Sequence, residues 1–357
     1  MSHCQHFGVC GGCATDNRAA IDKFSLLRSA LISAGYENPP VAPLVEIPLQ
    51  TRRRVDLAAT RSGAVISLGL HRSRSAEVVD MQECVLLDPS IVALLPPLRV
   101  LLRSLEGFRK TAAVVINLLD NGADLLLRGD ADFTNPDRNK IIAFARAQNI
   151  PRFSIARDKA EPEPVIILNP PIITLSGIPV EPAPGAFLQA STEGEAAILA
   201  ATLAGLPKLT AKSRIAELYA GIGTLTFALA KHARVEAYEG NADAVTAQEL
   251  AIRKNNLAGR ITLAQRDLSR RPLQAPDLTG RAAVILDPPY AGASSQMRFL
   301  IAASVPRIIY VSCNPEALAK DAHALAKAGY ALLGATPIDQ FPYSENLESV
   351  VVFGLSK

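Results

Sequence analysis

No uncharged apolar stretch of this 357-residue sequence approaches the roughly 18 residues that a membrane-spanning helix needs. The N-terminus lacks the basic and apolar regions of a secretory signal peptide, and no internal repeat or low-complexity tract occurs. The formal net charge is only +3, which is too small to mark a nucleic-acid-binding protein by composition. These absences predict a cytoplasmic protein without a membrane partner.

The residues that are present predict a folded chain of about two domains. Hydrophobic residues make up 49% and charged residues 20% of the sequence, which excludes a disordered chain and allows a sizeable core. Residues 51–74 contain six arginines and one aspartate, so this window carries +5 and the rest of the chain −2. A local basic surface is typical of a polyanion-binding site, although a solvated strand face gives the same pattern.

The first half of the chain is expected to be rich in β-structure. A helix is predicted over residues 16–35, with Asp16 as its cap and Gly35 at its end. Pro-rich connections and short β-like runs follow, and Asn121-Gly122 is expected to turn a hairpin. The predicted domain spans residues 1–185, and its first helix could pack on the domain that follows.

The second half alternates helical stretches with apolar strands, which predicts an α/β fold with a doubly wound, Rossmann-like sheet over residues 186–357. Ligands of such sheets bind beyond the carboxyl ends of the strands, so the residues there are candidate site residues. The expected strands lie at residues 214–219, 234–239, 261–266, 282–287 and 307–312, with two more near 331–339 and 348–355.

The first four strand ends suggest a nucleotide-like cofactor. Gly221 and Gly223 form a tight turn that lets the backbone approach a ligand. Glu239 ends the second strand and could accept hydrogen bonds from a ribose, while Asp267 ends the third strand, near an adenine. Asp287 ends the fourth in a stiff Asp-Pro-Pro-Tyr turn. Because the glycine turn lacks the third glycine of GxGxxG, the predicted cofactor is S-adenosylmethionine rather than NAD.

The fifth strand ends in Ser-Cys-Asn-Pro, which places Cys313 at a helix N-terminus, where the dipole favours a thiolate. A lone cysteine is most often a buried structural residue, but its place at the active edge of the sheet favours a nucleophile. Glu348 lies between the last two strands, where a carboxylate is usually only solvated. It is a candidate catalytic residue only in combination with Cys313. A thiolate, a base and a methyl donor are the minimal set for methylating carbon 5 of uracil through addition at carbon 6.

These residues resemble the RNA 5-methyluridine (uracil-C5) methyltransferase family, and the similarity is most specific in Ser-Cys-Asn-Pro, in Leu-Glu-Ser and in the N-terminal cysteines. The resemblance implies methyl transfer from S-adenosylmethionine to a uridine of RNA through a covalent adduct of Cys313 with carbon 6, with Glu348 as the base. Tyr290, Tyr343 and Asn346 depart from the family's usual residues. The positions that the resemblance assigns to donor binding are Gln189, Tyr219, Thr224, Glu239, Asp267 and Asp287, and Phe187 falls on an aromatic near the target base.

The N-terminal cysteines look like the family's four ligands to a [4Fe–4S] cluster. Cys4, Cys10 and Cys13 lie in a glycine-containing loop, C-x5-C-G-G-C, and Cys84 can supply the fourth thiolate from a strand. Structural zinc is the competing metal, and disulfides are disfavoured in a reducing compartment. The resemblance gives the cluster the role of fixing the N-terminal segment and helping to present RNA.

RNA is the expected partner, with 23S ribosomal RNA favoured over transfer RNA, and the chain is expected to be a monomer. Many bacterial relatives carry an N-terminal RNA-binding TRAM barrel, which is expected to be absent here because Cys4 stands almost at the start. The arginine run at residues 52–54 is then the best candidate to grip RNA, ahead of Arg74. Two other functions stay open: methylation of an exocyclic amino group of adenine or guanine, which Asp-Pro-Pro-Tyr also suits, and a non-catalytic iron–sulfur RNA-binding protein.

Overall fold

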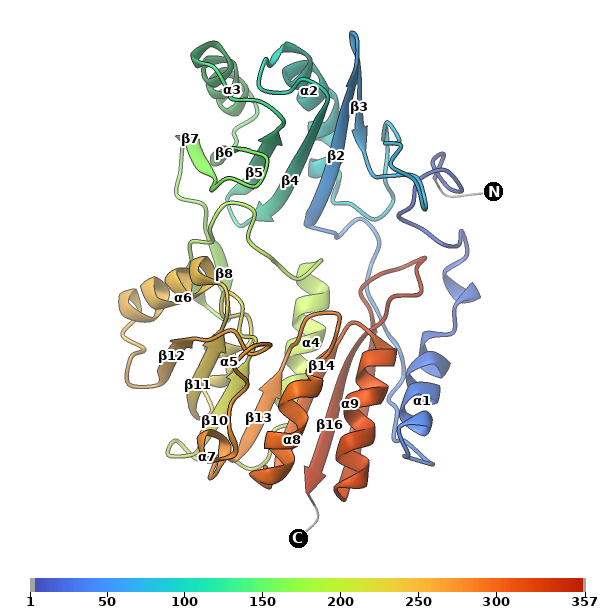
Figure 1. Cartoon of the computed structure of the whole chain (residues 1–357), viewed down its shortest axis with the longest axis vertical. Helices are drawn as coiled ribbons and strands as arrows, with labels where there is room; N and C mark the ends of the chain where they lie inside the picture. The colour runs from blue at the N-terminus through green and yellow to red at the C-terminus, as the bar shows by residue number, and fades with distance from the viewer. Residues whose placement is uncertain (1–3, 356–357) are drawn as a thin grey trace.

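The computed structural model describes residues 4–355, and its two larger sheets lie one above the other in Figure 1. The larger sheet has eight strands in the order β1-β15-β16-β14-β13-β10-β11-β12, and all are parallel except β16. This confirms the predicted α/β, Rossmann-like fold. Its strands are β1 (Val45–Glu46), β10 (Arg214–Leu218), β11 (Arg234–Glu239), β12 (Ile261–Gln265), β13 (Ala283–Leu286), β14 (Arg307–Ser312), β15 (Tyr330–Asp339) and β16 (Glu348–Leu355).

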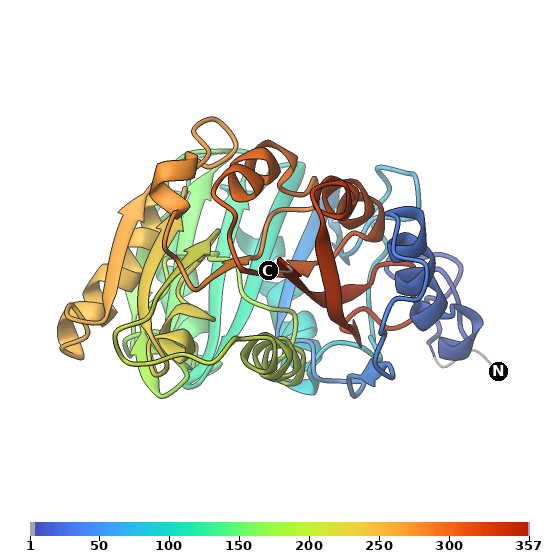
Figure 2. The same cartoon turned by 90° about the horizontal axis from the view of Figure 1, so that it is seen from below.

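Helices cover both faces of this sheet, as Figure 2 shows for α4 on one side and for α8 and α9 on the other. Ile198 of α4 packs in the core of the first face, and Leu300 of α8 and Leu318 of α9 pack in the core of the second. The apolar runs of the central strands are buried on both faces because successive side chains of a strand point to opposite sides. The first face carries α4 (Thr192–Ala204), α5 (Thr226–Leu229) and α6 (Ala242–Lys254); the second carries α7 (Ala275–Leu278), α8 (Ser294–Ala302) and α9 (Pro315–Lys327), with α1 beside α9.

The N-terminal segment joins the larger sheet, but its helix begins later than predicted. A 3-10 turn at Arg18–Ala20 precedes α1 (Lys23–Ser33), and Asp22 caps α1 in place of the predicted Asp16. The Asp22 carboxylate accepts a hydrogen bond from the backbone N–H of Ser25 at 3.0 Å, which stops the helix from extending toward the N-terminus. The buried leucines of α1 lie in one core with α9, and β1 adds a parallel edge strand to β15. Residues before position 185 therefore contribute to both sheets, and the division of the chain at that residue stays a prediction.

The second sheet has six strands in the order β3-β2-β4-β5-β6-β7, with α2 and α3 packed on one face. The predicted hairpin turn is confirmed: Gly122 has φ +128 and joins β4 to β5 directly after Asn121. A separate two-stranded hairpin, β8–β9, packs in the core of the larger sheet. The bounds are β2 (Arg54–Ser62), β3 (Val65–Gly69), β4 (Thr111–Leu119), β5 (Gly122–Gly129), β6 (Arg152–Arg157), β7 (Glu163–Ile167), β8 (Ile173–Leu175), β9 (Ile178–Val180), α2 (Pro89–Ser104) and α3 (Asn135–Ala147).

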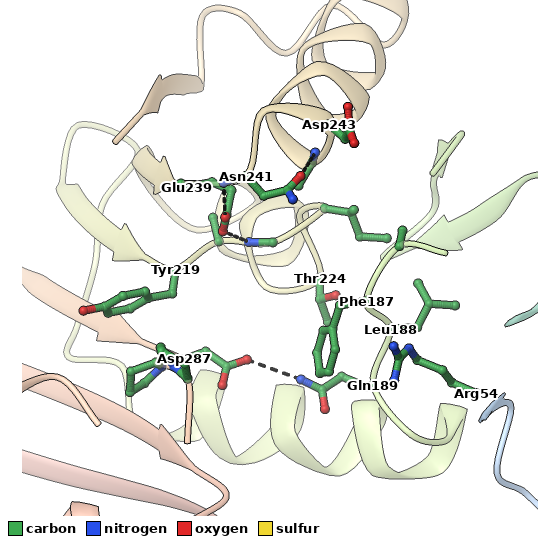
Figure 3. A pocket seen from close by; sticks show the side chains of 18 of the residues that line it. Arg54, Phe187, Leu188, Gln189, Tyr219, Thr224, Glu239, Asn241, Asp243 and Asp287 are labelled. Atoms are coloured by element: carbon green, nitrogen blue, oxygen red, sulfur yellow. Dashed lines mark hydrogen bonds between the residues drawn. The ribbon is translucent and has the colours of Figure 1, made fainter. Parts of the chain in front are cut away.

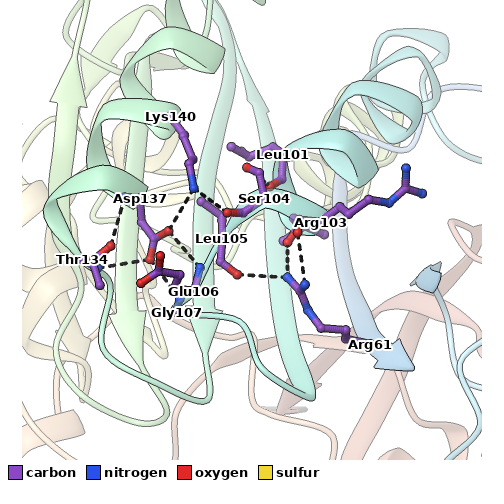
Figure 4. A network of polar contacts seen from close by, with 11 residues as sticks. Arg61, Leu101, Arg103, Ser104, Leu105, Glu106, Gly107, Thr134, Asp137 and Lys140 are labelled. Atoms are coloured by element: carbon purple, nitrogen blue, oxygen red, sulfur yellow. Dashed lines mark hydrogen bonds and ion pairs between the residues drawn. The ribbon is translucent and has the colours of Figure 1, made fainter. Parts of the chain in front are cut away.

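Figure 4 shows two charged side chains that form hydrogen bonds with the backbone, one at the C-terminal end of α2 and one in the first turn of α3. Arg61 donates hydrogen bonds to carbonyl groups at the end of α2, including those of Leu102 at 2.6 Å and Leu105 at 3.0 Å. The end of a helix leaves such carbonyls unpaired. Asp137 in the first turn of α3 accepts from the backbone N–H of Gly107 at 2.9 Å. Arg61, one of the six arginines in the basic window, thus stabilises the fold and is engaged inside the protein.

Across residues 4–355, none of the helices combines the length and the apolar character needed to cross a bilayer.

Candidate active site

A cavity of about 900 Å³ lies where the carboxyl ends of β10 to β14 meet, and Arg54 of β2 and Arg128 of β5 line it from the smaller sheet. Strand β16 runs antiparallel to β14, so its first residue reaches the same edge. Ser312 of β14 pairs with Ser349 of β16. Cys313 follows Ser312 and Glu348 precedes Ser349, so these two residues come next to each other at the cavity. Nine of the ten residues expected to bind a donor or perform catalysis line this cavity, and their roles stay predictions: Gln189, Tyr219, Gly221, Thr224, Glu239, Asp267, Asp287, Cys313 and Glu348.

The glycine turn after β10 is bonded to the end of β11. Gly221 and Gly223 both have positive φ, +57 and +101, which a residue with a side chain rarely adopts. Gly223 is turned away from the cavity, and a Cβ there would stand 2.4 Å from the ring of Phe227. The Glu239 carboxylate accepts one backbone hydrogen bond from Gly221 and one from Asn241, each at 2.7 Å (Figure 3). Since a carboxylate has about four acceptor sites, Glu239 keeps capacity for a ligand hydroxyl.

Two buried carboxyl groups line the same cavity. Burial, together with the negative charges of Asp287 and Glu239, raises the pKa of Glu217 to about 8. Burial and Glu239 likewise raise the pKa of Asp287 to about 7. Gln189 donates a hydrogen bond to Asp287 at 3.3 Å (Figure 3), whereas Oε2 of Glu217 has no partner among the described residues. A cationic ligand would offset the cost of ionising these acids, so the cavity suits a positively charged group.

These raised pKa values predict that the ligand-free protein loses stability as the pH rises. Glu217 holds its proton in the folded state up to a pH of about 8, but gives it up near pH 4.5 when unfolded. The folded state therefore binds more protons across this interval, and the melting temperature should fall by several degrees between pH 5 and pH 8.5. Glu217→Gln should remove a large part of that fall in differential scanning calorimetry, while Glu249→Gln, at an exposed site, should not. Equal slopes for the wild type and Glu217→Gln would contradict this expectation.

Cys313 lies between the end of β14 and Asn314, the cap of α9, as predicted. The predicted effect on its thiol is wrong. Burial, followed by the negative charges of Glu348 and Asp287, raises the pKa of Cys313 to about 11. A helix dipole contributes on the order of 1 kcal/mol or less, which these opposing effects exceed. Thiolate formation at Cys313 is therefore opposed first by burial and then by the two carboxyl charges.

Glu348 is buried at the start of β16, and burial together with Asp287 raises its pKa well above the usual range. Its Oε2 accepts a hydrogen bond from the side-chain amide of Gln340 at 3.2 Å. The same amide group donates to Oε1 of Gln189 at 3.1 Å. Gln340 thus connects the carboxyl group beside Cys313 to the residue that contacts Asp287.

The loop between β15 and β16 is held by the N-terminal segment. Asp339 ends β15 and is buried in an ion pair with Lys23 of α1 and another with Arg18, the latter at 2.6 Å. Lys23 also donates to the backbone carbonyl of Phe341 at 2.7 Å. Since Gln340 lies between Asp339 and Phe341, these contacts fix the backbone on both sides of it.

Tyr343 and Asn346, which replace residues usual in the resembled family, lie in this loop without reaching the cavity. Tyr343 is buried with φ +63, and its carbonyl accepts hydrogen bonds from the backbone N–H groups of Ala14 and Thr15. Asn346 is exposed. Tyr343 therefore ties the loop to the segment that carries the N-terminal cysteines.

The rim of the cavity carries aromatic and basic side chains. Phe187 is 66% exposed, and the guanidinium of Arg54 lies 5.4 Å from the centre of its ring (Figure 3). Tyr290 is 62% exposed, and its carbonyl accepts a hydrogen bond from Asn314 at 2.9 Å. Exposed rings beside a guanidinium are the kind of surface on which unstacked nucleobases bind.

The basic window is less available than its charge suggests. Arg53 is buried and forms an ion pair with Glu195 at 2.6 Å. Arg52 is packed beside the cysteine-lined cavity described next. Of the run at residues 52–54, Arg52 and Arg54 line the active-site cavity, and Arg54 also lies over the exposed ring of Phe187. Arg74 is exposed on a loop outside that lining. The alternation of a strand explains this outcome, because neighbouring residues cannot all face the same surface.

The four cysteines expected to bind metal surround a second cavity, of about 290 Å³. Burial, and then the negative charges of the neighbouring thiolates, raise the pKa of Cys13 to about 11. Gly11 passes so close to the strand region that a Cβ would stand 2.8 Å from the carbonyl oxygen of His71. Within residues 4–355, no group of three or more histidine, cysteine or acidic side chains is arranged to hold a metal ion. The lining cysteines are Cys4, Cys10, Cys13 and Cys84.

The cavity residues that the sequence-based predictions missed include two buried polar ones, Glu217 and Gln340. Glu217 opens the segment Glu-Leu-Tyr-Ala-Gly-Ile-Gly, so its place at a strand end was a usable signal. Gln340 has no comparable signal, because its partners Gln189 and Glu348 lie 151 and 8 positions away along the chain.

Comparison with known proteins gives a consistent result. The family model described as tRNA (Uracil-5-)-methyltransferase matches residues 183–355. A protein of Brucella suis named as an uncharacterized RNA methyltransferase is 36% identical over 356 residues, covering 98% of this chain and 83% of its own length. One of Rhizobium meliloti with the same description is 35% identical, covering 97% and 84%.

Among solved structures, the tRNA (uracil-54, C5)-methyltransferase of Pyrococcus abyssi, crystallised with S-adenosyl-L-homocysteine, superimposes with a TM-score of 0.71. The alignment covers 94% of this chain and 83% of that one, at 18% identity. The similarity therefore extends to the arrangement of both sheets.

Proposed function

Because this chain belongs to the RNA (uracil-5-)-methyltransferase family, we propose that it transfers a methyl group from S-adenosylmethionine to carbon 5 of a uridine in RNA. One observation carries the proposal: a thiol, Cys313, and a buried carboxyl group, Glu348, line the same cavity as the glycine turn and the acids after β10, β11 and β13. Nucleophile, proton acceptor and donor site are then within reach of one base.

The cavity residues fit the methyl donor. Gly221 lets the backbone turn closely under it, and Glu239 and Asp267 provide acceptors for the hydroxyl and amino groups of a nucleoside. The donor's sulfonium is cationic, and the buried acids Glu217 and Asp287 favour a positive charge. The Pyrococcus enzyme of the same fold was solved with the demethylated product of this donor.

The residues around Cys313 can carry out the reaction in three steps. The thiolate of Cys313 adds to carbon 6 of uracil, and the electron pair of the carbon 5–carbon 6 double bond forms an enolate. Carbon 5 then attacks the methyl carbon of the sulfonium, whose bond to sulfur breaks. Glu348 takes the proton from carbon 5, the double bond re-forms, and the thiolate leaves. The net products are 5-methyluridine, S-adenosylhomocysteine and a proton.

The proposed substrate is RNA, with 23S ribosomal RNA as the target that the sequence resemblance favours. We propose that the enzyme acts as a monomer in the cytoplasm. Phe187, Tyr290 and Arg54 at the rim support recognition of an unstacked base.

The test combines the purified protein, a labelled methyl donor and unmodified ribosomal and transfer RNA, followed by nucleoside mass spectrometry. Labelled 5-methyluridine in ribosomal RNA supports the proposal. Label in N-methylated adenosine or guanosine would replace it with the amino-group reaction that Asp-Pro-Pro-Tyr suits, and no label with intact donor binding would favour a non-catalytic RNA-binding protein.

The four N-terminal cysteines are proposed to hold a [4Fe–4S] cluster. All four cysteines line one cavity of about 290 Å³, and four cysteine thiolates are the usual ligands of such a cluster. Apolar side chains, including Leu70 and Met81, complete the cavity wall, and Arg52 places a positive charge beside the thiolates. A bound cluster would cross-link the N-terminal loop to Cys84, with no part in the chemistry of methyl transfer.

Protein purified without oxygen should contain about four irons per chain and show the visible absorption of an iron–sulfur chromophore. Cys84→Ser should lose most of both, because one of four ligands is removed, whereas Cys313→Ala should keep them. Colourless wild-type protein that contains one zinc ion per chain would overturn the cluster assignment.

A further inference from the structure

Gln340 bonds both to Glu348, beside the nucleophile, and to Gln189, on the donor side of the cavity. Its side-chain nitrogen donates to Oε2 of Glu348 at 3.2 Å and to Oε1 of Gln189 at 3.1 Å. Gln189 in turn donates to Asp287 at 3.3 Å. A continuous chain of hydrogen bonds therefore runs from the carboxyl group beside Cys313 to the carboxyl group of the donor side.

The orientation of the Gln340 amide is determined by its partners. Both groups in front of its nitrogen are oxygen acceptors, so a flipped amide would place three oxygens together. Behind it, the oxygen Oε1 lies beside Gly194 in the first turn of α4, where a Cβ would stand only 2.2 Å away. Oε1 is buried without a partner among the described residues. An unsatisfied buried acceptor costs stability, and the two hydrogen bonds that the Gln340 nitrogen donates offset that cost.

The backbone around Gln340 is also fixed. Asp339 on one side and the Phe341 carbonyl on the other are bound by Lys23 of α1, and Gln340 itself is 5% exposed. The amide therefore has little freedom to follow Glu348 if that carboxyl group moves.

On the basis of the proposed function, we propose that Gln340 is a positioning residue for proton removal: its amide holds the carboxylate of Glu348 toward the methylated base and couples it to Gln189. The charged and titratable groups that face Glu348 are Asp287 at the end of β13 and Cys313 at the end of β14, both of which disfavour its ionised form. Arg52 lines the active-site cavity as well, and it shares a small second cavity with Gln340. Two donors favour the ionised carboxylate, the side-chain amide of Gln340 and the backbone N–H of Ser349, and the Gln340 amide is the one supplied by a side chain.

The test separates proton removal from the earlier steps. In single-turnover reactions with RNA and the methyl donor, the covalent protein–RNA adduct is followed on denaturing gels across pH 6 to 9. Gln340→Met keeps the length of the side chain but removes the donor, so adduct decay should slow about tenfold and the acid limb of its pH profile should move to higher pH. The KM values for donor and RNA should change less than about threefold, because the bond between Gln189 and Asp287 remains.

Two further variants make the result decisive. Gly194→Ala leaves Gln340 in the sequence but displaces its amide, and should reproduce the pH shift. Gln296→Met removes a buried glutamine that bonds to Leu273 away from the cavity, and should leave the pH profile unchanged. An unshifted acid limb in Gln340→Met, or the same shift in Gln296→Met, would overturn the proposal. Failure of the wild-type protein to form 5-methyluridine would instead refute the proposed function.

Discussion

Replacing Cys313 with alanine should lower the rate of 5-methyluridine formation by about four orders of magnitude or more. Carbon 5 of uracil is a poor nucleophile until a sulfur atom adds to carbon 6 and pushes electron density onto it. Among the described residues that line the cavity, Cys313 alone carries a thiol, so no neighbour can take its place. Single-turnover transfer of a labelled methyl group to RNA measures the loss.

The control for this variant is the binding of the donor. Cys313 is a small, half-buried side chain at the end of β14, so Cys313→Ala should change donor affinity in calorimetry by less than about threefold. Retained formation of 5-methyluridine would rule out the covalent route. Retained transfer to an exocyclic amino group, with no 5-methyluridine from either protein, would point to the alternative chemistry at Asp287 and Tyr290.

The acids around Cys313 link the nucleophile to the donor. The negative charges of Glu348 and Asp287 help raise the pKa of the Cys313 thiol to about 11, so the thiolate is rare at neutral pH in the free protein. A cationic sulfonium bound near Asp287 would offset this charge and make the thiolate less costly. We therefore expect adduct formation to be much slower in the absence of donor than in its presence.

The sequence predicted much of this site because the fold follows a simple rule. Parallel strands bury apolar runs, and residues directly after such runs meet at one edge of the sheet. This rule located Gly221, Glu239, Asp287 and Cys313 around one cavity without any knowledge of their contacts. Glu348 follows the same logic in reverse, since β16 is antiparallel and begins where β14 ends.

Features that depend on tertiary contacts could not be predicted in this way. The predicted cap of the helix at residues 16–35 was Asp16, but the side chain that bonds to the first turn of the helix is that of Asp22. The charge of Arg53 suggested an RNA contact, but its ion pair with Glu195 is visible only in three dimensions. For Cys313, its position at a helix N-terminus suggested a low pKa. Burial and two carboxyl groups that are distant in the sequence but near in space raise the pKa instead.

Glu348→Gln should trap a covalent complex between the protein and methylated RNA. The amide that replaces the carboxylate cannot accept the carbon-5 proton, so the double bond cannot re-form and Cys313 cannot leave. Turnover should fall about a hundredfold to ten-thousandfold, and a slowly migrating protein–RNA band should appear on denaturing gels. The hydrogen bond from Gln340 can persist to the carbonyl oxygen of the new amide, so the geometry of the site is kept.

The same substitution should leave the first step intact or make it faster. Glu348 is the larger of the two charges that raise the pKa of Cys313, and its removal makes the thiolate easier to form. Glu348→Gln thus separates the two halves of the reaction: adduct formation continues and adduct decay stops. Glu345→Gln, at an exposed site in the same loop, should behave like the wild type, and the double variant with Cys313→Ala should show no slow band. Normal turnover without an adduct would show that another group removes the proton.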